Sequence, residues 1–198
     1  MIPSPDRFRE PFTAENTAFL FVDHQTRMLE AVGDQPREQL RTSLVAVARA
    51  ARALDVPIVL TSASTDMIGP TIPELAEALD GLPNIERTVI SAWDDARVRE
   101  AVAATGRRKL VFGAIGTNVC LTHATIGAAA DGYEAYGATD ISGTANVLLR
   151  EAAVAQMVQA GVGITNAAGA IFQILGDNAS PLAGDVYAAM GPLLAPVS

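Results

Sequence analysis

The chain has 198 residues, of which 49% are hydrophobic and 18% charged, and this composition predicts one well-buried globular domain over residues 1–198. The formal net charge is −8 and no run of basic residues occurs, which argues against a nucleic-acid partner because phosphate neutralisation needs clustered Lys and Arg. No segment approaches the roughly 18 consecutive apolar residues of a membrane span, so we expect no membrane partner either.

Apolar runs alternate with helical patterns along the chain. Thr17–Asp23 is a continuous apolar run that ends in an acid, which is typical of a strand buried on both faces. Apolar residues at helical spacing then predict a helix over Gln35–Leu54. The elements expected next are strand Val56–Ser62, helix Pro73–Leu79, strand Glu86–Ile90, helix Asp94–Thr105, strand Lys109–Gly113, helix Val119–Ala130 and strand Tyr133–Thr139.

The last third of the chain continues this alternation. Ser142 and Thr144 are candidate N-caps for a helix that runs through Val158. A short strand is expected at Val162–Thr165, and the glycines and prolines after it predict a variable C-terminal stretch.

Strands separated by helices predict right-handed crossovers and a three-layer α/β/α (Rossmann-like) fold with a six-stranded, mainly parallel sheet. In the common strand order 3-2-1-4-5-6, strands 1 and 4 are neighbours where the order reverses, and ligands bind beyond the carboxyl ends of the strands at that point. Asp23 ends the first strand, and Cys120 starts the helix after the fourth. Arg87 lies in the third strand, but its direction depends on a register that the sequence does not fix.

Cys120 is the only cysteine, which excludes an internal disulfide and favours a reducing cytoplasm. A buried strand leads through a glycine-rich loop to this residue in the first turn of a helix. There the helix dipole and free backbone N–H groups would favour the thiolate, and the same N–H groups could receive an oxyanion. Each candidate also has a purely structural interpretation: Cys120 as a small core residue, Asp23 as a loop cap and Arg87 as a solvated charge.

Metal and nucleotide sites are not predicted. His24 and His123 are far apart and belong to no ligand-spacing pattern, and a second thiolate is missing. Gly113 and Gly116 lack the further glycine or lysine of nucleotide-binding loops, which disfavours a flavodoxin-like nucleotide binder. We therefore expect no cofactor.

Three segments together resemble the isochorismatase-like cysteine hydrolase superfamily: LFVDHQ with Asp23, GAIGTNVC with Cys120, and GYEAYGATDISGT. The resemblance extends over roughly Thr13 to Gly169. Within the superfamily, the residues preceding Cys120 and the stretch TDISGTANVLLREAAVAQMVQAGV look most similar to octameric hydrolases of unassigned substrate.

The resemblance implies a catalytic triad in which Cys120 is the nucleophile, Asp23 the general base and Arg87 the basic residue, a position that is usually lysine in the family. It also implies a cis peptide bond between Ile115 and Gly116, with the backbone N–H groups of Gly116 and Cys120 forming an oxyanion hole. Because a guanidinium does not exchange its proton at ordinary pH, Arg87 would act only as a fixed charge and hydrogen-bond donor.

The leading hypothesis is a metal-independent hydrolase of a small amide-, ureido- or related carbonyl-type substrate that forms a thioester with the cysteine. Gln25, Trp93 and Asn118 are candidate substrate-binding residues, and Asn118 stands where many relatives carry an acid. The nicotinamidase branch of the family binds a metal through one Asp and two His after the second strand. The corresponding segment here, Thr61–Ile68, contains an Asp but no His, which disfavours membership of that branch. The alternative is a non-catalytic oligomeric binding or redox-sensing protein on the same scaffold.

Location and assembly follow from the same observations. The N-terminus lacks the apolar centre of a secretory signal, so we expect a cytoplasmic protein. A mean hydropathy of +0.25 favours surfaces hidden between subunits, and the resemblance implies a homo-oligomer, either a tetramer or an octamer.

Overall fold

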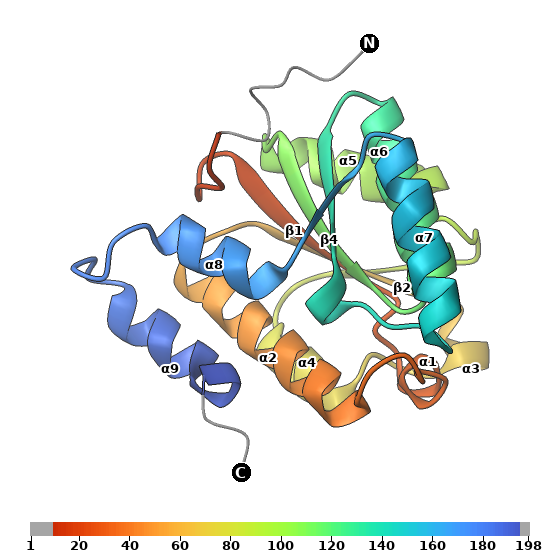
Figure 1. Cartoon of the computed structure of the whole chain (residues 1–198), viewed down its shortest axis with the longest axis horizontal. Coiled ribbons are helices and arrows are strands. Elements are labelled where there is room, and N and C mark those ends of the chain that lie inside the picture. The colour runs from red at the N-terminus through yellow and green to blue at the C-terminus, as the bar shows by residue number, and fades with distance from the viewer. Residues whose placement is uncertain (1–9, 195–198) are drawn as a thin grey trace.

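The computed structural model describes residues 10–194, in which six parallel strands form one sheet in the order β3-β2-β1-β4-β5-β6. Helices cover both faces of this sheet (Figure 1). The predicted strand order and three-layer architecture are therefore confirmed. The strands are β1 (Thr17–Val22), β2 (Ile58–Ala63), β3 (Asn84–Arg87), β4 (Lys109–Ala114), β5 (Glu134–Ala138) and β6 (Gly163–Thr165).

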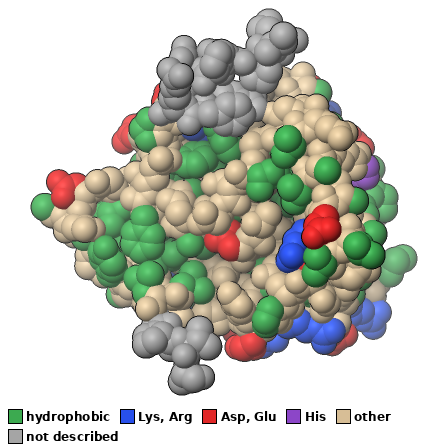
Figure 2. Space-filling model, viewed as in Figure 1, with side chains coloured by type: hydrophobic (Ala, Val, Ile, Leu, Met, Phe, Trp, Pro, Cys, Tyr) green, Lys and Arg blue, Asp and Glu red, His purple; other side chains and the backbone are tan. Residues whose placement is uncertain are grey.

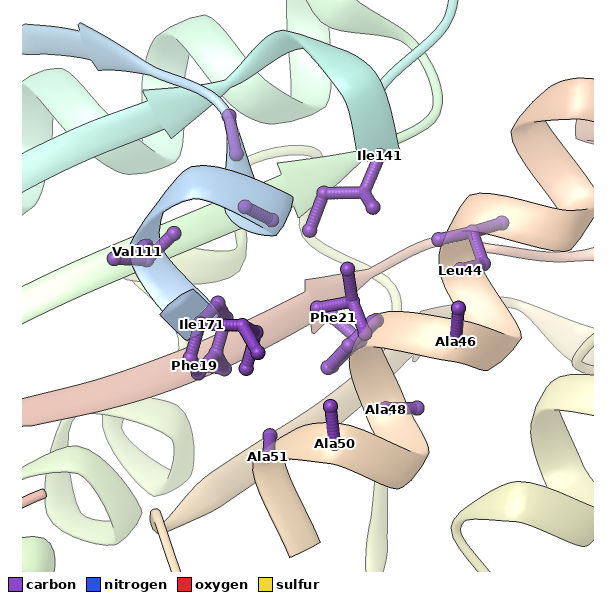
Figure 3. Packing of buried hydrophobic residues seen from close by; sticks show 14 of the residues in the cluster. Phe19, Phe21, Leu44, Ala46, Ala48, Ala50, Ala51, Val111, Ile141 and Ile171 are labelled. Carbon is purple, nitrogen blue, oxygen red and sulfur yellow. The ribbon is translucent and has the colours of Figure 1, made fainter. Parts of the chain in front are cut away.

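Side chains of β1 alternate between two hydrophobic cores, as expected for a central parallel strand covered on both faces. Phe19 and Phe21 face one core, whereas Leu20 and Val22 face the other. Figure 3 shows the first core, where the two phenylalanines lie between α2 and Ile171 of α8. The first core is covered by α2 (Arg37–Ala53), α4 (Pro73–Ala78), α8 (Ala167–Leu175) and α9 (Ala183–Leu194), and the second mainly by α5 (Ala96–Thr105), α6 (Thr122–Ala130) and α7 (Val147–Gln159).

Short elements follow several strands at their carboxyl ends. They are α1 (Thr26–Glu30), α3 (Thr65–Ile68), the 3-10 helices η2 (Ala92–Asp94) and η4 (Thr139–Ile141), and the π-helical turn η3 (Thr117–Leu121). The turn η3 immediately precedes α6, so the predicted helix over Val119–Ala130 begins irregularly.

Three local predictions are wrong. The third strand ends at Arg87 rather than Ile90, because residues 88–90 turn away and the Arg87 side chain binds their carbonyls. The N-cap of α7 is Asn146, whose side chain accepts a hydrogen bond from Leu149 N. The candidate caps Ser142 and Thr144 instead donate to Ala138 O and to Asn118.

The third wrong prediction is the variable C-terminal stretch, which forms α8 and α9 and covers the sheet. Figure 2 shows hydrophobic side chains gathered over these two helices, where Leu182, Tyr187 and Leu194 are exposed. Within residues 10–194 we find no helix with both the length and the apolar character that a bilayer span requires.

Candidate active site

Asp23 follows directly after β1, at the point in the sheet where the strand order reverses. Its backbone has a φ of 56°, a left-handed conformation that Asp tolerates better than most residues with a side chain. Asp23 N donates to Thr61 O at 3.0 Å, and Gln25 N donates to Asp23 O at 2.8 Å, which fixes the turn. The side chain is almost completely buried.

Arg87 ends β3 and reaches past the end of β2 to meet Asp23. Its Nη2 lies 2.5 Å from Asp23 Oδ2, and both side chains are removed from solvent. Its Nη1 donates to Val89 O at 2.5 Å and to Ile90 O at 2.9 Å. One guanidinium therefore neutralises the carboxylate and fixes the loop that follows β3.

Cys120 lies in the turn η3 beyond the end of β4, the strand that pairs with β1. The peptide bond between Ile115 and Gly116 is cis. Thr117 N donates to Gly143 O at 2.9 Å, and Leu121 N donates to Gly116 O at 3.2 Å, so both ends of the turn are held. The cysteine is 7% exposed, enough to contribute to the lining of a cavity.

Burial raises the pKa of the Cys120 thiol to about 12, and the adjacent Asp23 carboxylate adds to this effect. The Gly116 N–H and the Arg87 charge act in the opposite direction but are outweighed. Burial also raises the pKa of Asp23, against the lowering effects of Arg87 and the thiol. The prediction of a favoured thiolate is therefore wrong for the resting state: the sulfur keeps its proton beside the carboxylate.

The second oxygen of Asp23, Oδ1, is buried and has no hydrogen-bond partner among the described residues, and the nearby Ala63 backbone contributes to lowering the pKa of this carboxyl. Because Oδ2 is bound to Arg87, Oδ1 is available to accept a proton from the neighbouring thiol. This arrangement suits a base that acts when the sulfur attacks, rather than one that forms a stable thiolate beforehand.

A cavity of about 500 Å³ opens beside these three side chains, at the carboxyl ends of the strands. Its walls come from α1, α3, the loop after β3, the cysteine turn and the start of α7, and they are mostly apolar. The lining residues with large hydrophobic side chains are Met28, Val32, Met67, Ile68, Val89, Ile90, Ile115, Val119 and Leu149.

Two predicted substrate-binding residues do not line this cavity. The Gln25 side chain donates to Ala63 O at 2.9 Å and Gly69 O at 2.6 Å and accepts from Ala63 N at 2.9 Å, so it braces the chain between α1 and β2. Trp93 is buried in the second core against α6, where its Nε1 donates to Asp131 Oδ2 at 2.8 Å. The polarity of Gln25 and the size of Trp93 do not show, from the sequence alone, whether each side chain contacts a ligand or holds the fold together.

Asn118 lines the cavity, as predicted. Its Oδ1 accepts a 2.6 Å hydrogen bond from the hydroxyl of Thr144, whose own backbone N–H donates to Asp34 Oδ1 at 2.9 Å. Asp34 therefore supports the cysteine turn indirectly, through Thr144 and Asn118. Sequence reasoning missed this connection, since the partners are 26 and 110 residues apart in the chain.

No group of three or more His, Cys, Asp or Glu side chains in residues 10–194 is arranged to hold a metal ion. His24 is buried and its Nε2 donates to Ile141 O at 2.9 Å, whereas His123 is exposed on α6. Neither imidazole lines the cavity.

Comparisons with known proteins agree with this geometry. The model of the Isochorismatase domain family matches residues 17–169. The chain is 33% identical to the probable hydrolase YcaC of Escherichia coli over 74% of this chain and 71% of the relative. The solved E. coli YcaC structure, described as an octameric hydrolase of unknown specificity, superposes with a TM-score of 0.87 at 29% identity and covers 92% of this chain and 91% of its own.

A second solved structure, YcaC from Pseudomonas aeruginosa with hexane-2,5-diol and covalent acrylamide, has a TM-score of 0.86 and 32% identity, with 93% of each chain covered. The family match spans more than half of the chain, and it includes Asp23, Arg87 and Cys120. The chain therefore belongs to the isochorismatase family of hydrolases.

Proposed function

We propose that this protein is a metal-independent cysteine hydrolase of a small amide-, ureido- or related carbonyl-type substrate. It would cleave the bond between the carbonyl carbon and the leaving group through a thioester on Cys120. The observation that supports this proposal most is the convergence of Asp23, Arg87 and Cys120 from three separate strand ends in the lining of one cavity. Arg87 takes the place of the usual basic residue, and Asp23 is the base.

The proposed reaction begins from a neutral thiol. As the sulfur attacks the carbonyl carbon, the S–H proton passes to Asp23 and a C–S bond forms. The N–H groups of Gly116 and Cys120 receive the negative oxygen of the tetrahedral intermediate. Collapse breaks the bond to the leaving nitrogen, which takes the proton from Asp23, and a thioester remains.

Water then completes the reaction. Asp23 takes a proton from the water, whose oxygen attacks the thioester, and the C–S bond breaks as the sulfur recovers the proton. Arg87 acts throughout as a fixed positive charge and hydrogen-bond donor, as guanidinium groups in proteins do. Its role is to stabilise the Asp23 carboxylate and to balance the negative charge that develops nearby.

The solved relative from P. aeruginosa contains covalent acrylamide, and acrylamide reacts with nucleophiles. This supports, by relationship, a nucleophilic site in the present chain. The alternative of a redox-sensing protein receives less support, because redox-sensor cysteines have a low pKa and the pKa of Cys120 is raised to about 12.

We further propose that the chain forms a single catalytic domain that assembles as a homo-oligomer in the cytoplasm. The octameric state of the E. coli relative supports assembly. Exposed hydrophobic side chains over α8 and α9, among them Tyr187 and Leu194, supply an apolar surface of the kind that subunit contacts cover. Light scattering of the purified protein measures the number of subunits.

The experiment that tests the proposed function measures hydrolysis of a panel of activated esters and simple amides by the wild type and by Cys120→Ala. Quenched samples are analysed by intact mass spectrometry and peptide mapping. We expect an acyl adduct on Cys120 and no turnover in the variant. Turnover without an adduct on this residue, or equal activity in Cys120→Ala, would refute the mechanism.

A further inference from the structure

We infer that the cavity selects substrates that are electrically neutral and have an apolar body next to the reacting carbonyl. This inference deepens the proposed function and depends on it only for the identity of the reacting group. The selecting surface is formed by Met67, Val89, Ile90 and Leu149, which we call the apolar wall.

The first argument is the balance of charge in the cavity. Among the described lining residues, the ionisable side chains are Asp23, Arg87 and Cys120. The first two form a buried ion pair at 2.5 Å whose charges cancel, and the thiol is neutral at ordinary pH. A substrate carboxylate or ammonium group would enter this cavity without an opposite charge, and burying an unpaired charge is costly.

The second argument is the chemistry of the walls. The remaining polar side chains in the lining are neutral: Ser64, Thr88, Asn118 and Thr144. Asn118 and Thr144 already bond to each other. The apolar wall lines the cavity, and its members Met67 and Ile90 are 70% and 67% exposed. A volume of about 500 Å³ is within the usual range for a small-molecule site.

The third argument is that the wall is held in place by the catalytic machinery. The Nη1 group of Arg87 donates to the carbonyls of Val89 and Ile90, and its Nη2 group binds Asp23. Two residues of the apolar wall, Val89 and Ile90, are thus fixed at their backbone relative to the base. A lysine at position 87 could hold the carboxylate, but it lacks the planar fork that reaches these carbonyls at the same time.

The test compares three alkylating probes with one reactive group: N-pentyl chloroacetamide and its analogues with a terminal carboxylate or a terminal ammonium group. The rate of Cys120 alkylation is measured by peptide mass spectrometry and divided by the rate with free glutathione, which corrects for intrinsic reactivity. Alkylation does not require hydrolysis, so the result is independent of whether the protein turns over a substrate.

We expect the neutral probe to alkylate Cys120 at least about tenfold faster than either charged probe after correction. Ile90→Lys should raise the relative rate of the carboxylate probe, whereas Val158→Lys, at an exposed position outside the cavity, should leave all three ratios unchanged. Equal corrected rates in the wild type, a faster charged probe, or no alkylation by any of the three would overturn the inference.

Discussion

Arg87 Nη2 and Asp23 Oδ2 are 2.5 Å apart, and neither side chain is accessible to solvent. A charge pair buried to this extent is strongly destabilising when one partner is removed, because the other charge is left without compensation. The pair also joins the edge strand β3 to the central strand β1 at the end of the sheet where the cavity lies. Stability and the proposed chemistry would therefore depend on the same contact.

Arg87→Met should destabilise the fold by about 3–5 kcal/mol, since Asp23 would remain buried without its partner. Arg87→Lys should cost less, because an ammonium group can still approach the carboxylate. In the lysine variant the loop of Val89 and Ile90 loses its two hydrogen bonds. We expect KM for apolar substrates to rise more than kcat falls, and urea unfolding together with steady-state kinetics measures both effects. Equal stability of the Met variant and the wild type would contradict this prediction.

Trp93→Phe tests whether the tryptophan is structural. The change removes the hydrogen bond to Asp131 and some packing beside Gly127, so we expect a loss of about 1 kcal/mol or more in the free energy of unfolding. Kinetic constants should stay near those of the wild type, since Trp93 does not line the cavity. A large change in KM without loss of stability would restore the substrate-binding role.

Thr144→Val tests the support of the cysteine turn. The substitution keeps the size of the side chain but removes the donor to Asn118 Oδ1, which should cost about 1 kcal/mol of stability. Because Asn118 lies two residues before Cys120, we also expect slower acylation of the cysteine. Thr144→Ser, which keeps the hydroxyl, is the matched control and should retain most of the rate.

Because His24 is buried, we expect the free energy of unfolding to depend on pH. Burial lowers the pKa of its imidazole from 6.5 to about 4, so the unfolded chain binds more protons than the folded one between these values. Stability is therefore complete above about pH 6.5 and falls as the pH decreases toward 4, with a loss of about 2 kcal/mol near pH 5 relative to pH 7.5.

The variant His24→Gln is the check on this assignment. Glutamine keeps an N–H donor for Ile141 O but does not titrate in this range. Urea unfolding at several pH values should show a flatter profile in the variant than in the wild type. The same slope in both proteins would mean that other groups cause the pH dependence.

The sequence was sufficient to predict the sheet, its strand order and the meeting of Asp23 with Cys120. A buried run that ends in an acid and a glycine-rich turn before a cysteine are both local signals. The topology then places these two signals side by side, because strands 1 and 4 are neighbours in the sheet. The direction of Arg87 was not predictable, because it depends on the register of an edge strand. The helices α8 and α9 were missed because their apolar faces lie between glycines and prolines that also suggest loops.

The remaining errors have a common physical origin. The favoured thiolate was inferred from the helix start and the charge of Arg87, whereas the burial of Cys120 and the charge of Asp23 are properties of the folded surroundings that outweigh them. Gln25 likewise has the chemistry of a ligand contact, but in three dimensions its amide is fully used by backbone groups. The apolar wall could have been suspected from large hydrophobic residues in the short segments that follow β2 and β3, such as Met67 and Ile90.

The variant Asp23→Asn tests the central claim most directly, through turnover and iodoacetamide alkylation of Cys120 measured together across alkaline pH. If Asp23 acts as the base during attack, the variant should lose about 10²–10⁴-fold in turnover. Its thiol should nevertheless ionise at a lower pH and be alkylated faster there, because the negative charge that raises the pKa of Cys120 is gone. A variant that keeps its turnover, or one whose thiol becomes harder to alkylate as turnover falls, would contradict this account.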